Sequence, residues 1–67
     1  MEYRRIRHFL GLRQADVSAA TGISIGRVAG VENGRLRLNP TEKRALEEFY
    51  RARIRMLAEE KLEDSRG

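Results

Sequence analysis

Arginine is the side chain in this sequence with the clearest capacity for binding chemistry. Twelve of the 14 basic residues are arginine, whose planar guanidinium fits phosphate oxygens and guanine edges better than a lysine ammonium does. Residues 1–39 hold seven arginines and three acids, whereas residues 40–67 hold seven basic and seven acidic side chains. The net charge of +4 therefore lies in the first part of the chain. This asymmetry predicts a nucleic-acid partner, and an arginine-rich soluble surface is the alternative.

Residues suited to other kinds of chemistry are scarce. There is no cysteine, and His8 is the single histidine, so neither a metal-ligand set nor a nucleophile with its base is available. We expect no catalysis, no metal, no cofactor and no small-molecule ligand. No apolar run exceeds four residues even when glycine is counted, which predicts a cytoplasmic protein without a signal peptide or membrane span.

The elements that must position the arginines are predicted to be helices. Apolar residues at helical spacing indicate a helix over residues 2–10 and a second over residues 14–21. The second would turn Ala15, Val17 and Ala20 inward and end at Gly22 in a left-handed conformation. After a tight turn, Ser24 can cap a third helix that ends at Asn33-Gly34.

A long helix is predicted in the second half of the chain. Residues 35–39 alternate like a strand but have no partner strand, and we interpret them as an extended linker. Asn39-Pro40-Thr41-Glu42 is a strong helix start, and no glycine or proline interrupts residues 41–64. The fold class is all-α: residues 1–38 form the core, residues 39–64 a C-terminal helix that completes it, and residues 65–67 a disordered tail.

The predicted second and third helices, joined by a three-residue turn, have the geometry of a helix-turn-helix. In that motif the second helix of the pair lies in the DNA major groove. The ungapped stretch from Leu10 to Gly34 resembles the Cro and lambdoid-repressor type of helix-turn-helix, the XRE family, through Gln14, Gly22 and Glu32-Asn33-Gly34. Pro40 also falls where some phage repressors carry a proline, so the resemblance covers about 30 of the 67 residues. The resemblance implies a small lambda-repressor-like domain of three short helices followed by a long one, with Glu32 tying the third helix to the rest. It also implies that Gln14 anchors the DNA backbone.

The outward positions of the predicted third helix are candidates for base contact. They are Arg27 for guanine, Ile25 for thymine methyls, and Gly26 and Gly30 for close backbone approach. Burial of Ile25, and helix packing at the two glycines, are the alternatives. The family usually has a hydrogen-bond acceptor before the glutamine, whereas Arg13 stands here, so we expect a weaker helix start and a free guanidinium. The candidates for DNA backbone contact are Gln14, Arg13, Ser24, Asn33, Arg35 and Arg37.

The long helix carries an apolar stripe that exceeds what a three-helix core needs. We expect it to form a homodimer interface, mainly through Phe49, Tyr50, Ile54, Leu57 and Leu62. Arg51, Arg53 and Arg55 spread around the helix and are interpreted as a solvated surface.

The predicted function is a sequence-specific transcriptional regulator of phage or mobile-element type. It would be a homodimeric autorepressor that binds an inverted repeat in double-stranded DNA through the major groove. An antitoxin-type module, whose long helix binds a partner protein, is the alternative from another class. An architectural DNA-bending protein is a third reading.

Overall fold

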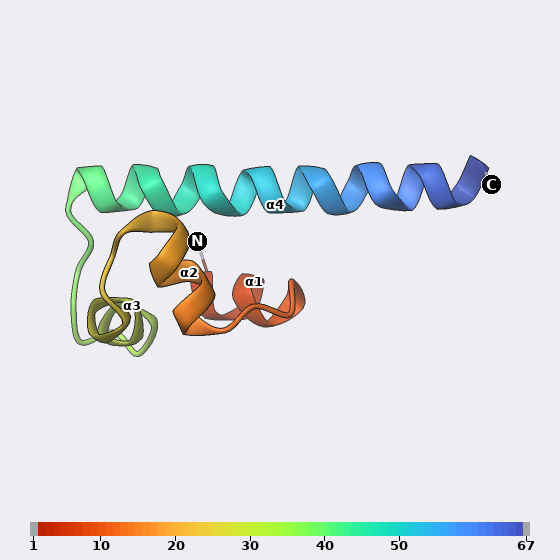
Figure 1. Ribbon diagram of the computed structural model, residues 1–67. Coiled ribbons are helices and arrows are strands. Elements are labelled where there is room, and N and C mark those ends of the chain that lie inside the picture. The colour runs from red at the N-terminus through yellow and green to blue at the C-terminus, as the bar shows by residue number, and fades with distance from the viewer. Residues whose placement is uncertain (1, 67) are drawn as a thin grey trace.

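The computed structural model describes the backbone of residues 2–66 as four helices (Figure 1). They are α1 (Tyr3–Phe9), α2 (Gln14–Thr21), α3 (Ile25–Glu32) and α4 (Pro40–Arg66). The short helices lie on one side of the first half of α4, and the second half of α4 projects beyond them (Figure 1). The principal extents are 44 × 20 × 19 Å. The all-α prediction is confirmed, and residues 2–66 contain no strand.

The turn between α2 and α3 has the predicted conformation. Gly22 adopts φ +76°, the left-handed region that glycine enters without a Cβ clash, and its N–H donates to the Ser18 carbonyl at 2.9 Å. Two residues later, the Ser24 hydroxyl accepts from the Arg27 backbone N–H at 3.2 Å. Such a cap satisfies one of the free N–H groups at a helix start. The residues around the turn therefore fix where α2 ends and α3 begins.

The start of α4 is a reciprocal cap. The Glu42 N–H donates to the Asn39 side-chain oxygen at 2.8 Å, and the Asn39 N–H donates to a Glu42 carboxylate oxygen at 3.0 Å. The predicted helix start is confirmed, with Pro40 as the first helical residue. At the other end, residues 65 and 66, which we expected in a tail, belong to α4, and Gly67 lies outside the described residues.

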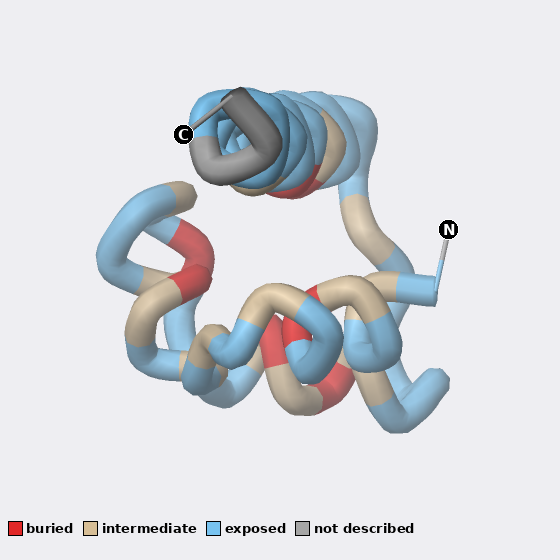
Figure 2. Tube along the Cα trace, turned by 90° about the vertical axis from the view of Figure 1, so that its right-hand side faces the viewer, coloured by how far each residue is buried: buried red, intermediate tan, exposed pale blue. Residues whose placement is uncertain are grey.

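The core lies between α4 and the short helices, on the side of α4 that faces them (Figure 2). Its buried members come from α2, α3, α4 and the α2–α3 turn and are Val17, Ile23, Val28, Leu46 and Tyr50. Ala15 and Ala20, which we expected to face inward, are exposed. Residues two apart on a helix differ by about 200° in direction. Burial of Val17 therefore turns Ala15 outward.

Tyr50 is a core residue and not part of an exposed interface, which corrects the sequence-based assignment. It is 1% exposed, and its ring stacks on that of Tyr3 with centroids 6.0 Å apart. Among the described residues its buried hydroxyl has no hydrogen-bond partner. Burial, the largest cause, raises the pKa of the Tyr50 hydroxyl to about 12.

We expect Tyr50→Phe to raise the free energy of unfolding by about 1 kcal/mol, because it removes a buried polar atom that has no partner. The ordinary tyrosine pKa is 10.0 and the folded value is about 12. Ionisation of Tyr50 therefore leaves the free energy of unfolding unchanged below the first value. It lowers this free energy as the pH rises from the first value to the second, because the folded state disfavours the phenolate, and the phenylalanine variant should lack this loss. Urea unfolding at about pH 8 and at about pH 11 measures both effects. A phenylalanine variant that is less stable, or equally sensitive to alkali, would contradict this account.

Candidate nucleic-acid interface

One side of α3 is exposed at three of its four residues and half-buried at Ala29. Its residues are Ile25, Gly26, Ala29 and Asn33, called here the α3 row. Ile25 is 49% exposed, so the alternative that it is a core residue is wrong. A Cβ built on Gly26 would meet nothing within 4 Å. Residues spaced three and four apart share one side of a helix, so the α3 row is a continuous surface on which a duplex could lie close to the backbone.

Arginines lie beside the C-terminal end of the α3 row. Arg35 and Arg37 follow α3 and are exposed, and Arg4 lines one surface depression together with Gln14 and Asn33. Within residues 2–63, whose side chains the structure describes, neither Arg4 nor Arg37 forms an ion pair. The Arg35 Nε donates to the Asn33 side-chain oxygen at 3.2 Å. The start of α1, the start of α2 and the end of α3 thus meet at one positively charged surface.

A buried ion pair holds α1 to the end of α3. Arg7 donates from Nε to Glu32 Oε2 at 2.8 Å and from Nη2 to Glu32 Oε1 at 2.9 Å, and the two side chains are 10% and 5% exposed. Arg7 Nη1 also donates to the Leu12 carbonyl at 3.0 Å. Sequence reasoning missed Arg7, although it follows Tyr3 and precedes Leu10 at helical spacing and so shares their inward side.

Gln14 joins this ion pair. Its Nε2 donates to Glu32 Oε1 at 3.1 Å, so the first residue of α2 is fixed to the last residue of α3. Burial alone would raise the pKa of the Glu32 carboxyl, but hydrogen bonds from Arg7 and Gln14 outweigh it and hold the pKa below its ordinary value. This geometry agrees with the tying role that the resemblance implied for Glu32. It also positions Gln14 at the edge of the depression that contains Arg4 and Asn33.

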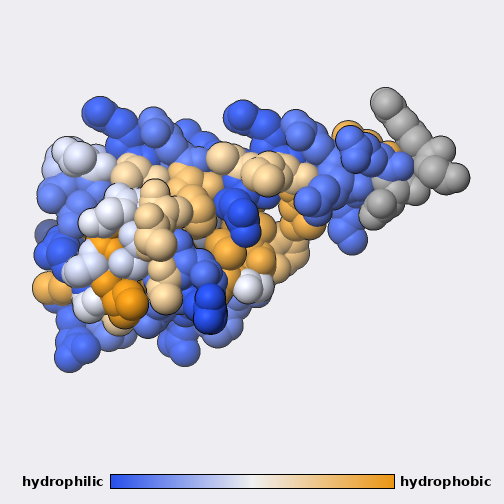
Figure 3. All heavy atoms as spheres, viewed as in Figure 1, coloured by the Kyte–Doolittle hydropathy of each residue, from blue (hydrophilic) through white to orange (hydrophobic). Residues whose placement is uncertain are grey.

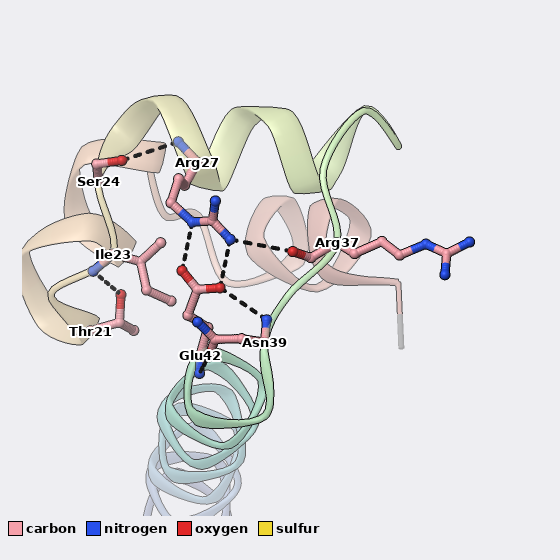
Figure 4. A network of polar contacts seen from close by, with 7 residues as sticks. All are labelled: Thr21, Ile23, Ser24, Arg27, Arg37, Asn39 and Glu42. Carbon is pink, nitrogen blue, oxygen red and sulfur yellow. Dashed lines mark hydrogen bonds and ion pairs between the residues drawn. The ribbon is translucent and has the colours of Figure 1, made fainter.

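Arg27 lies on a different side of α3, toward α4 (Figure 4). Its Nε and Nη2 donate to the Glu42 carboxylate at 2.6 and 2.7 Å, and Nη2 also donates to the Arg37 carbonyl at 3.3 Å. The hydrogen bond from Arg27, the largest cause, lowers the pKa of the Glu42 carboxyl. These contacts correct the expectation that Arg27 extends freely toward bases, because its guanidinium instead ties α3 to the start of α4.

Gly30, which we expected to approach DNA bases, instead packs against Leu36. A Cβ at this position would come within 2.5 Å of Leu36 Cδ1, so the missing side chain makes room for Leu36. The alternative that Gly30 serves packing is therefore supported. At Ser24 the hydroxyl is exposed but already caps α3.

The start of α2 is firmer than the sequence suggested. The Arg13 backbone N–H donates to the Asp16 carboxylate at 2.8 Å, and the Arg13 guanidinium reaches the same group at 3.2 Å. Hydrogen bonding from the Arg13 side chain, the largest cause, lowers the pKa of the Asp16 carboxyl. Arg13 lies at the surface beside Gln14, with 82% of its side chain exposed. We expected its guanidinium to be free, but it is paired with Asp16.

Comparison of the chain with protein-family models, with curated proteins and with solved structures finds no match. Along the described residues, no helix combines the length and apolar character needed to cross a bilayer.

Proposed function

We propose that this chain is a sequence-specific DNA-binding transcriptional regulator that acts as a homodimer, with α2, the turn at Gly22 and α3 forming a lambda-repressor-like helix-turn-helix. The observation that carries the proposal is the α3 row: a largely exposed helix side with Arg4 and Arg35 beside its C-terminal end. A recognition helix needs such a surface to enter the major groove, and flanking arginines supply the phosphate contacts that set its orientation.

Each part of the surface has a distinct role in this proposal. Ile25 contacts thymine methyl groups, and Asn33 hydrogen-bonds a base edge or a phosphate at the end of α3. Gly26 and Ala29 keep the helix side low, so that its backbone approaches the duplex closely. Arg35 and Arg37, together with Arg4, Arg13 and Gln14, bind the sugar-phosphate backbone.

Replacement of Gly26 by alanine should change folding stability and DNA affinity in opposite directions. Because the new Cβ meets nothing in the free chain, Gly26→Ala should raise the free energy of unfolding by about 0.8 to 1.0 kcal/mol. The same methyl group would stand between α3 and the duplex, so affinity for DNA should fall about tenfold. The probe is a duplex selected by the parent chain from a random-sequence library, with binding measured by fluorescence anisotropy.

The matched control is Ala52→Gly on the exposed outer side of α4. It should lower the free energy of unfolding by a similar amount and leave DNA affinity unchanged at temperatures where the chain is folded. If Gly26→Ala binds the selected duplex as tightly as the parent chain does, the α3 row is not the reading surface.

A further inference from the structure

Large apolar side chains remain exposed where α4 leaves the short helices. Phe9 at the end of α1 is 72% exposed, and Met56 on α4 is 51% exposed. They line one surface depression together with Leu10, Arg53, Leu57 and Glu60, called here the overhang surface. Figure 3 shows hydrophobic atoms below α4 at this position, whereas most of its outer side is hydrophilic. An exposed apolar surface with a charged border is typical of a protein–protein interface.

The charges along α4 change sign across the overhang surface. Residues 51–55 contain three arginines and no acid, whereas residues 59–64 contain four acids and one lysine. Two copies of α4 packed in parallel would bring each segment beside its own like charge. Antiparallel packing would bring the basic segment of one copy beside the acidic segment of the other. Like charges in contact disfavour a complex, so the charge order selects the antiparallel arrangement.

Arg53 and Glu60 have the spacing that a two-fold antiparallel pair requires. They are seven residues apart, two helical turns, and so extend from nearly the same side of α4. A two-fold axis that is perpendicular to α4 and passes between the two copies, level with the midpoint between these residues, would place Arg53 of each copy beside Glu60 of the other. This rotation leaves each residue on the same flank of the helix pair. Phe9, Met56 and Leu57 of both copies would fill the space between these ion pairs.

We infer that a second copy of this chain docks antiparallel on the overhang surface, with reciprocal Arg53–Glu60 ion pairs between the copies. This inference rests on the proposed dimer but not on DNA binding. It revises the interface expected from the sequence. Tyr50 belongs to the core, and Phe49 packs on its ring at 5.3 Å. Ile54 lines a neighbouring depression with Arg4 and Arg5, and Leu62 is about 140° from Leu57 around the helix.

The test uses charge reversal at the two ion-pair positions, without DNA. Sedimentation velocity of the full chain at tens of micromolar should show a dimer. Arg53→Glu alone and Glu60→Arg alone should each weaken dimerisation at least tenfold, because each creates two like-charge contacts. An equimolar mixture of the two variants should restore a heterodimer, since the carboxylate introduced by Arg53→Glu in one chain then meets the guanidinium introduced by Glu60→Arg in the other. Arg55→Glu, the same charge change on the opposite side of α4, is the matched control and should dimerise normally.

A monomeric parent chain would overturn the inference, and capture of a different protein by this surface would then favour the antitoxin-type alternative. Single variants that dimerise as tightly as the parent would also overturn it. So would single variants that stay monomeric when mixed. Because no duplex is present, these results are independent of DNA binding, which a duplex carrying one half-site tests separately.

Discussion

Arg7→Ala is expected to remove at least about a third of the free energy of unfolding at 25 °C. The change leaves the Glu32 carboxylate buried without its bidentate partner and leaves the Leu12 carbonyl without its donor. Breaking a buried ion pair from one side costs about 3 to 5 kcal/mol. The whole stability expected for a domain of this length is about 3 to 10 kcal/mol. Urea unfolding followed by circular dichroism at 222 nm measures the loss.

Two further variants test whether the lone buried charge causes that loss. Arg13→Ala removes an arginine from the exposed ion pair with Asp16 and should unfold near the urea concentration of the parent chain. The double variant Arg7→Met/Glu32→Leu should recover much of the stability, because it leaves no buried charge behind. Equal losses for Arg7→Ala and Arg13→Ala would show that the buried pair does not hold α1 to α3.

An inverted repeat should bind the dimer about 10² to 10⁴ times more tightly than a duplex with one half-site. Once one copy is bound, the second α3 is held near its own half-site at a high effective concentration. The half-site centres should lie about 34 Å apart, since both recognition helices must enter the same side of the duplex. Fluorescence anisotropy with the selected duplex and its single-half-site derivative measures the ratio.

Altered spacing provides the control for this prediction. Inserting about five base pairs turns one half-site about half a turn around the duplex, and most of the gain should disappear. Equal affinity for the inverted repeat, the spaced repeat and the single half-site would mean that the copies bind DNA independently. That result would contradict the prediction that the operator is an inverted repeat bound by a two-fold dimer.

The helix boundaries could be predicted because short-range chemistry sets them. Gly22, Ser24 and the Asn39-Pro40-Glu42 start act through contacts within four residues, and all appear as the sequence indicated. It was harder to predict which side of a short helix faces the core. In α2 a single fully buried residue, Val17, fixes the orientation, and alanines give too weak an apolar pattern to reveal it.

The candidate site was less predictable because its contacts join residues far apart in sequence. Arg27 meets Glu42 across 15 positions and Arg7 meets Glu32 across 25, and an arginine that ties helices has the same pattern as one that contacts DNA. Tyr50 and Leu57 share one apolar stripe, but only the structure shows that the short helices cover the first and leave the surface around the second open.

The central claim is that the α3 row reads DNA, and amide chemical-shift mapping tests it most directly. An isotopically labelled chain is titrated with the selected duplex while the amide signals are followed by NMR. The account predicts that the largest shifts occur at Ile25, Gly26, Ala29, Asn33 and Arg35, with little change at Ala52 on the outer side of α4. Unchanged signals along α3, with the largest shifts at the overhang surface instead, would contradict it.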